Sequence, residues 1–223
     1  MALQQIINSA VRILIVDDHP IVREGLSSLL SKQPDFQVCG EADDMQSALA
    51  LVDESHPHVL IIDISLKKGS GLDLIRRIME TDRSIRMVVC SLHDDTLYAE
   101  RALKAGALGY VNKHEATLTI VTAIRQILTG KMYVSERMSE RLTRRLIGSG
   151  PTKARYGIEA LSERELQVFE LIGAGLTTVE IARRLNLGVK TIETHRRRIK
   201  EKLNIMTSAQ LAREAAQWTL EHN

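Results

Sequence analysis

The sequence predicts an α/β protein with a doubly wound, five-stranded parallel sheet, followed by a small all-α domain of four helices. Three observations support this fold class. Apolar runs alternate with amphipathic segments through the first 130 residues. The run Val59–Ile62 is apolar throughout and rich in β-branched residues, which is typical of a strand buried on both faces of a parallel sheet. From residue 158 onward, the apolar residues recur only at helical spacing.

Five apolar runs in the first part of the chain are predicted to be strands, and the segments between them to be helices. Five such units in about 120 residues are typical of a doubly wound sheet. The strands are expected over Val11–Asp17, Phe36–Glu41, His58–Asp63, Arg86–Ser91 and Ala107–Val111. The helices are expected over Pro20–Lys32, Met45–Ser55, Leu72–Thr81, Thr96–Ala105 and Ala116–Thr129. Pro20 at a first helical position supports the first helix start.

The second part carries helix signals only. Ser162 and Glu165 have the spacing of a capping box, and the short segment 186–188 separates two helices in the manner of a helix-turn-helix. The helices are expected over Ser162–Gly173, Thr177–Leu185, Val189–Leu203 and Ser208–Leu220. The predicted domains are therefore 1–130 and 158–223, joined by a basic, partly helical linker over 131–157.

Composition and charge narrow the function classes. No apolar run reaches the roughly 18 residues that a membrane span requires, and residues 1–10 lack signal-peptide features, so we expect a cytoplasmic protein with no membrane partner. Residues 1–130 carry 13 basic and 17 acidic residues, whereas residues 183–202 carry 8 and 2. This asymmetry predicts that the second domain binds a polyanion.

Carboxylates follow two of the predicted strands. Asp17 and Asp18 end the first strand and Asp63 ends the third. In the flavodoxin-like strand order these strands are neighbours, about 4.8 Å apart, so the three carboxylates would converge. Such a cluster calls for a cation, and Mg²⁺ with its all-oxygen shell suits it best. The alternative for a single Asp at position 17 or 18 is that it only caps the following helix.

The helix predicted over Val189–Leu203 has one apolar face, formed by Ile192, Ile199 and Leu203, and cationic outer faces. A helix of this kind suits the major groove of double-stranded DNA. The alternative is that Glu193 and Arg197, four residues apart, only pair with each other on a solvated face.

Both halves resemble known families. Residues 11–130 resemble the receiver domain of two-component response regulators, through Asp17-Asp18, Asp63, Gly71, Ser91 and Gly109–Lys113. Residues 158–220 resemble the LuxR-type helix-turn-helix, through Leu161–Glu165, Gly175–Thr177, Glu180–Ala182, Lys190–His195 and Lys202-Leu203. The two in this order resemble a NarL/FixJ-type response regulator.

The resemblance implies a role for each site residue of the first domain. Asp63 would accept a phosphoryl group from a sensor histidine kinase. Mg²⁺ would be held by Asp17, Asp18, Asp63 and the backbone carbonyl of Ser65. Lys113 and the Ser91 hydroxyl would contact the phosphoryl oxygens, and movement of Ser91 and Tyr110 would form the switch. One departure is Lys67, which occupies the place of the usual proline.

For the second domain, the resemblance makes Glu193, Thr194 and Arg197 the expected base-reading residues. The residues expected to contact phosphates are Thr177, Lys190, Thr191, His195, Arg198 and Lys202. The family often dimerises through its last helix, so we expect a homodimer on phosphorylation. RNA polymerase is considered as a further partner. His195 has an alternative interpretation as a structural histidine.

The predicted function is a phosphorylation-controlled, DNA-binding transcription regulator and not an enzyme. One alternative is a regulator controlled by protein contacts, with little use of Asp63. Another is an aspartyl-phosphate-forming phosphohydrolase. Ser65 counts against the hydrolase, because such enzymes usually carry a second aspartate at that position.

Overall fold

The computed structural model describes residues 10–92, 95–146 and 157–222. The chain forms two compact units, Met1–Thr143 and Arg144–Asn223, and each is described by itself. Among the described residues, every helix is too short or too polar to cross a membrane.

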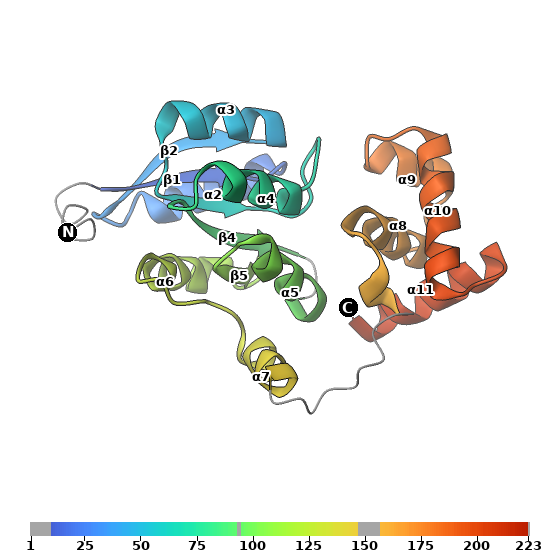
Figure 1. Ribbon diagram of the computed structural model, residues 1–223. Helices are drawn as coiled ribbons and strands as arrows, with labels where there is room; N and C mark the ends of the chain where they lie inside the picture. Colours follow the sequence, from blue (N-terminus) through green and yellow to red (C-terminus); the bar gives the residue numbers. More distant parts are fainter. Residues whose placement is uncertain (1–9, 93–94, 147–156, 223) are drawn as a thin grey trace. The chain divides into compact units, whose positions relative to one another are not determined.

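The first unit is built on a five-stranded parallel sheet with the order β2-β1-β3-β4-β5 (Figure 1). The strands are β1 (Val11–Val16), β2 (Phe36–Ala42), β3 (Val59–Ile62), β4 (Arg86–Ser91) and β5 (Gly109–Asn112). The predicted sheet is therefore confirmed, as is the expected pairing of the first strand with the third. Val16 pairs with Ile62, so β1 and β3 end at the same edge of the sheet.

Helices cover both faces of this sheet (Figure 1). They are α2 (Pro20–Leu30), α3 (Met45–Ser55), α4 (Gly71–Thr81), α5 (Asp95–Ala105) and α6 (Ala116–Leu128). α2 packs against α6 over one face, while α4 packs against α3 and α5. Because successive strand residues point to opposite faces, Ile13 and Ile61 join the core under α2 and α6, whereas Leu14 and Leu60 are buried in the other layer.

The segment after α6 belongs to the first unit. Tyr133 forms a parallel bridge with Gly109 on the outer edge of β5. The following helix, α7 (Glu136–Leu146), begins after Ser135, and Met138 in its first turn is fully buried. α7 lies within the predicted linker, and Tyr133 before it adds a bridge to the sheet.

The second unit consists of the short 3₁₀ turn η2 (Ile158–Ala160) and the four predicted helices. These are α8 (Glu163–Gly173), α9 (Thr178–Arg184), α10 (Val189–Leu203) and α11 (Ser208–His222). α8 packs closely on α11, and a Cβ added at Gly173 would lie 2.4 Å from the Ala215 carbonyl oxygen. The Phe169 and Trp218 rings meet edge to face across these helices, with centroids 6.0 Å apart.

Candidate functional site

The three predicted carboxylates meet at the edge where β1 and β3 end. Asp17 and Asp63 are almost fully buried, at 2% and 3% exposure, because each directly follows a central strand. Asp17, Asp18, His19 and Asp63 each offer a ligand atom, and these atoms all lie within 4.8 Å of one another. The expected convergence is therefore present, and His19 joins it.

Lys113 connects two of these carboxylates. Its Nζ lies 2.6 Å from Asp17 Oδ2 and 2.7 Å from Asp63 Oδ2, and its side chain is only 6% exposed. Burial lowers the pKa of this ammonium, but attraction by Asp63 and Asp17 outweighs burial and leaves the Lys113 pKa above its usual value. Lys113 is therefore a fixed positive charge beside Asp63.

Other buried polar atoms at this edge have unused bonding capacity. Among the described residues, Asp63 Oδ1 and Ser91 Oγ are buried without a hydrogen-bond partner, which is uncommon in folded proteins. Burial raises the pKa of Asp18, and the negative charges of Asp63 and Asp17 raise it further, against His19 and Lys113. A cluster of carboxylate oxygens with an unpartnered, buried acceptor fits the oxygen donor set that Mg²⁺ prefers.

Gly71 allows the chain to turn tightly after Asp63. Its N–H donates to the Ile64 carbonyl oxygen at 2.9 Å. A Cβ added at position 71 would lie 2.0 Å from the Asp63 carbonyl oxygen, closer than any real contact. Ser65 and Ser70 pair across the same turn as an isolated bridge. Gly71 thus positions the backbone beside the acidic edge, the name used here for Asp17, Asp18 and Asp63 at the ends of β1 and β3.

Tyr110, the second predicted switch residue, lies in β5 and is 3% exposed, so its ring is packed inside the first unit. Its backbone N–H donates to the Tyr133 carbonyl oxygen at 2.8 Å, and the Tyr133 N–H donates to the Leu108 carbonyl oxygen at 2.9 Å. The position of Tyr110 is therefore coupled to the segment that follows α6.

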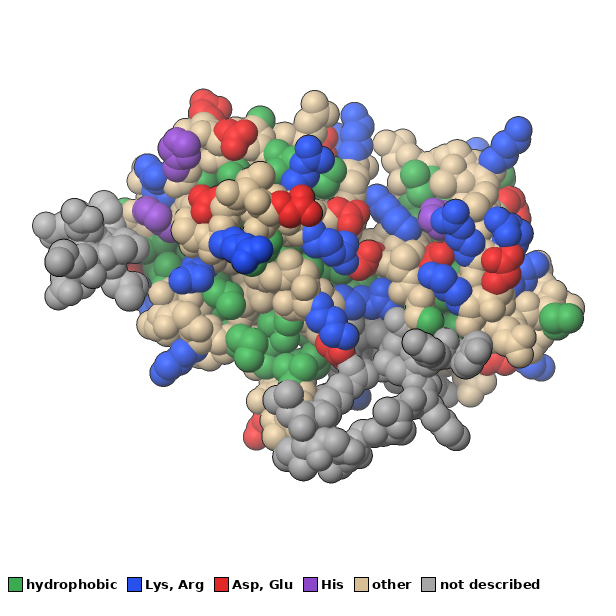
Figure 2. All heavy atoms as spheres, in the orientation of Figure 1, with side chains coloured by type: hydrophobic (Ala, Val, Ile, Leu, Met, Phe, Trp, Pro, Cys, Tyr) green, Lys and Arg blue, Asp and Glu red, His purple; other side chains and the backbone are tan. Residues whose placement is uncertain are grey.

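In the second unit, two of the three residues predicted for the apolar face of α10, Ile192 and Ile199, are fully buried, and Leu203 is half-buried. Lys and Arg side chains gather over α9 and α10, with carboxylates among them (Figure 2). The spacing in the sequence allowed an ion pair between Glu193 and Arg197. In the part of the chain that the structure describes, Arg197 Nη1 instead lies 2.7 Å from Glu201 Oε1, and Glu193 is not part of that ion pair.

The predicted phosphate contacts differ in their surroundings. Lys190, Thr191 and Arg198 are exposed on α10. Thr177 caps α9 in a reciprocal capping box with Glu180. Lys202 Nζ contacts the buried Glu165 at 2.6 Å. His195 is partly buried, and burial lowers its pKa, so its imidazole is mainly neutral at pH 7.

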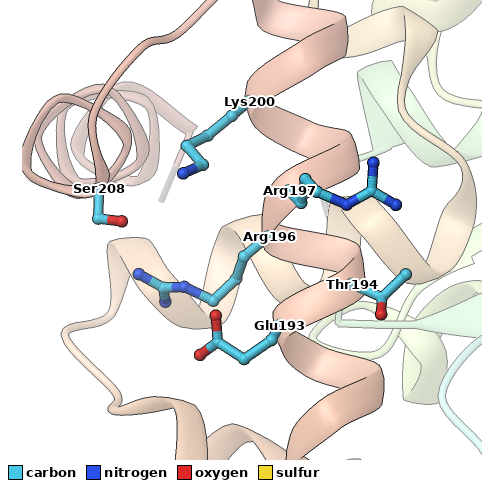
Figure 3. A pocket seen from close by; sticks show the side chains of 6 residues that line it. All are labelled: Glu193, Thr194, Arg196, Arg197, Lys200 and Ser208. Atoms are coloured by element: carbon cyan, nitrogen blue, oxygen red, sulfur yellow. The ribbon is translucent and has the colours of Figure 1, made fainter.

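A hollow of about 360 Å³ lies between α10 and the start of α11. Its lining residues are Glu193, Thr194, Arg196, Arg197, Lys200 and Ser208. Figure 3 shows Glu193, Arg196 and Lys200 on the side of α10 nearer Ser208, and Thr194 and Arg197 on the other side of the same helix. Two basic side chains one helical turn apart, beside a helix start, form a positively charged surface.

Comparisons with known proteins agree with both halves of this description. Residues 13–125 match the model of the response regulator receiver domain. Residues 159–215 match the model of bacterial regulatory proteins of the luxR family. The chain is a response regulator of the NarL/FixJ type. Members of this family are phosphorylation-controlled transcription regulators, each with a receiver domain followed by a LuxR-type DNA-binding domain.

The sequences of several relatives align with nearly the whole chain of the response regulator. GacA of Pseudomonas aeruginosa is 33% identical over 202 residues, 91% of this chain and 94% of the relative. The oxygen regulatory protein NreC of Staphylococcus carnosus is 32% identical over 209 residues, 92% of this chain and 96% of the relative. RcsB of Salmonella enterica serovar Typhimurium, solved bound to the rprA promoter with phosphomimetic BeF₃⁻, is 27% identical with a TM-score of 0.62, covering 93% of this chain and 99% of that structure.

The response regulator departs from the usual pattern at Lys67, and the structure shows the contacts of this residue. Lys67 Nζ lies 3.2 Å from Asp43 Oδ2, and the Lys67 N–H donates to the Asp43 carbonyl oxygen at 3.3 Å. The Met45 N–H donates to the Lys68 carbonyl oxygen at 3.2 Å. The loop after Asp63 is thereby attached to the loop after β2.

Several residues at these two sites were absent from the sequence prediction. His19 directly follows the predicted pair Asp17-Asp18, but the position of a residue in the sequence does not show whether its ring turns toward these carboxylates or toward solvent. Arg196 and Lys200 are two of the eight basic residues counted over 183–202, and this excess of positive charge was the only indication in the sequence that they belong to a binding surface. Ser208 was expected only as the start of the last helix.

Proposed function

We propose that the response regulator is switched by phosphoryl transfer to Asp63 from the phosphohistidine of a sensor histidine kinase. The observation that carries this proposal is the Asp63 carboxylate, which is buried, contacted at Oδ2 by Lys113 and without a hydrogen-bond partner at Oδ1 among the described residues. In the transfer, a carboxylate oxygen of Asp63 attacks phosphorus and the bond between phosphorus and the kinase nitrogen breaks. The kinase histidine keeps that electron pair, and an aspartyl phosphate forms.

The residues around Asp63 suit this chemistry. Asp17, Asp18, Asp63 and the Ser65 carbonyl would hold Mg²⁺, which neutralises charge on the transferring group when bound. The Lys113 ammonium supplies a second positive charge close to Asp63. The Ser91 hydroxyl has no hydrogen-bond partner among the residues that the structure describes, and it would donate to a phosphoryl oxygen.

Phosphorylation would then change the surface formed by β5 and α5. Withdrawal of the Ser91 hydroxyl toward the phosphoryl group and reorientation of Tyr110 would bias two arrangements of this surface. The consequence we propose is homodimerisation, with the face of α11 formed by Ala209, Ala212, Ala216 and Thr219 as part of the contact. A dimer matches two half-sites on double-stranded DNA.

The proposed DNA surface is α10. Glu193, Thr194 and Arg197 would read base edges, and six basic or hydroxyl-bearing residues around them would contact phosphates. The phosphate contacts proposed are Thr177, Lys190, Thr191, His195, Arg198 and Lys202. In this role Lys202 would have to share its ammonium with Glu165. RNA polymerase as a partner stays a prediction.

The experiment measures DNA affinity and oligomeric state with and without a small phosphodonor and Mg²⁺. It compares the wild type with Asp63→Asn and with Asp53→Asn, a matched change at an exposed residue of α3. We expect the donor to increase affinity and dimer content in the wild type and in Asp53→Asn, but not in Asp63→Asn. An equal response in Asp63→Asn would exclude Asp63 as the switch and favour control by a protein partner.

A further inference from the structure

His19 contacts the carboxylates on which the proposed metal site depends. Its ring Nδ1 lies 2.7 Å from Asp18 Oδ1 and 3.2 Å from Asp17 Oδ1. Because an ionised carboxylate only accepts hydrogen bonds, Nδ1 donates in the hydrogen bond with Asp17 Oδ1. Its contact with Asp18 Oδ1 is an ion-pair distance, and this oxygen has no hydrogen-bond partner among the described residues. The imidazole thus uses carboxylate oxygens that a hard divalent cation would also need.

Two donors share this carboxylate cluster, and they differ in mobility. Lys113 contacts the Oδ2 atoms of Asp17 and Asp63, and its side chain is 6% exposed. His19 contacts the Oδ1 atoms of Asp17 and Asp18, and its side chain is 57% exposed. Lys113 is therefore enclosed by protein, whereas the His19 ring can rotate into water without opening the core.

The start of α2 does not depend on the His19 ring. His19 is the N-cap residue, but its side chain makes no capping hydrogen bond. Its backbone holds the turn instead, because its N–H donates to Asp17 Oδ1 at 2.9 Å and its carbonyl oxygen accepts from the N–H of Val22 at 3.1 Å. Rotation of the ring would leave this backbone arrangement in place.

We propose that the His19 imidazole holds the Asp17 and Asp18 oxygens until Mg²⁺ displaces it, so that His19 sets the Mg²⁺ concentration at which the acidic edge is loaded. This inference rests on the proposed function, since it assumes that the carboxylate cluster is the Mg²⁺ site. It makes His19 a positioning residue that acts through the cation ligands.

The test titrates Mg²⁺ alone into the ¹⁵N-labelled full chain at one fixed pH, without phosphodonor, and follows the amide signals of Asp17, Asp18 and Asp63. We expect His19→Ala to bind Mg²⁺ about two- to tenfold more tightly than the wild type, the range set by one net hydrogen bond. His19→Phe, which keeps a ring but has no donor, should gain the same affinity. In the wild type, the His19 ring signals should shift along with the amide signals.

Two controls separate this inference from the site itself. His56→Asn changes a remote histidine at the end of α3 and should leave the Mg²⁺ affinity unchanged. Asp18→Asn should lose Mg²⁺ binding, and full binding in that variant would refute the proposed metal site. If His19→Ala bound Mg²⁺ with the same affinity as the wild type or more weakly, the proposal that Mg²⁺ displaces the His19 imidazole would be overturned. A gain in His19→Ala without one in His19→Phe would also overturn it, because steric access would then explain the change.

Discussion

The backbone N–H of Tyr110 donates a 2.8 Å hydrogen bond to the carbonyl oxygen of Tyr133. This bond fastens the segment before α7 to the outermost strand of the receiver sheet, at the residue proposed to switch. A shift of β5 at position 110 would therefore also move residue 133, where the segment that leads to the DNA-binding domain begins.

Replacing Tyr133 by proline tests this attachment. Proline removes the N–H that donates to the Leu108 carbonyl oxygen, so we expect a loss of about 0.5–1.5 kcal/mol in the free energy of unfolding and faster hydrogen exchange at the Tyr110 amide. Tyr133→Ala keeps the backbone donor and is the control. Unchanged exchange at Tyr110 in the proline variant would contradict the attachment.

A methyl group at Gly71 should disturb the phosphoacceptor directly. Because the added Cβ would lie 2.0 Å from the Asp63 carbonyl oxygen, the backbone must shift, and we expect Gly71→Ala to lose about 1–3 kcal/mol of stability and to phosphorylate poorly. Urea unfolding and the phosphorylated fraction measure these effects. Gly25→Ala on α2 meets no atom within 4 Å and should instead gain about 0.5–1 kcal/mol.

The ion pair between Lys202 and Glu165 predicts an acid-sensitive DNA-binding domain. Burial raises the pKa of Glu165, but hydrogen bonds from Lys202 and from Ser162 outweigh it and lower the pKa below the usual 4.5. A carboxyl whose pKa is lower when folded stabilises the fold above its unfolded pKa and loses this contribution as pH falls through the folded pKa.

Trp218 is the single tryptophan of the chain and packs against Phe169, so its fluorescence reports this domain. Lys202→Met should cost about 1–3 kcal/mol near neutral pH, because it leaves a buried carboxylate with fewer partners. Its stability should then depend less on acid than that of the wild type. Parallel pH profiles for the two proteins would show that the pair contributes nothing.

Arg196 and Lys200 line the hollow beside Ser208, and we predict that they contact DNA phosphates in addition to the six residues proposed above. Alanine at either position should weaken binding to all sequences alike and reduce the salt slope by about 1 for each lost contact. Arg213→Ala changes an exposed arginine of α11 and should leave the slope unchanged. Arg197→Ala should instead alter base preference, measured with single-base operator variants.

The sequence predicted the edge formed by Asp17 and Asp63 because it follows from strand order alone. Parallel strands place their carboxyl ends together, and only the adjacency of β1 and β3 was needed. The direction of the His19 ring follows instead from side-chain rotation, which residue spacing does not encode. The contact between Lys202 and Glu165 joins residues 37 positions apart and depends on how α8 and α10 cross.

The bridge between Tyr133 and Gly109 could not be predicted from the sequence for a different reason. Residues 131–135 show no alternation of apolar and polar side chains, and one bridged pair leaves no periodic signal. Their placement is decided by the unpaired edge of β5, which is a property of the folded sheet. The helix after them was predictable, because Met138 and Leu142 recur at helical spacing.

The acidic edge has a consequence for the evolution of the chain. Of the three carboxylates that converge there, Asp18 is the least compensated, because Lys113 contacts Asp17 and Asp63, whereas burial and the two neighbouring carboxylates raise the pKa of Asp18. Asp18→Asn should therefore raise the melting temperature, measured by circular dichroism without added cation, while abolishing phosphorylation. The receiver thus trades thermal stability for reactivity at the residues that make it a signalling protein.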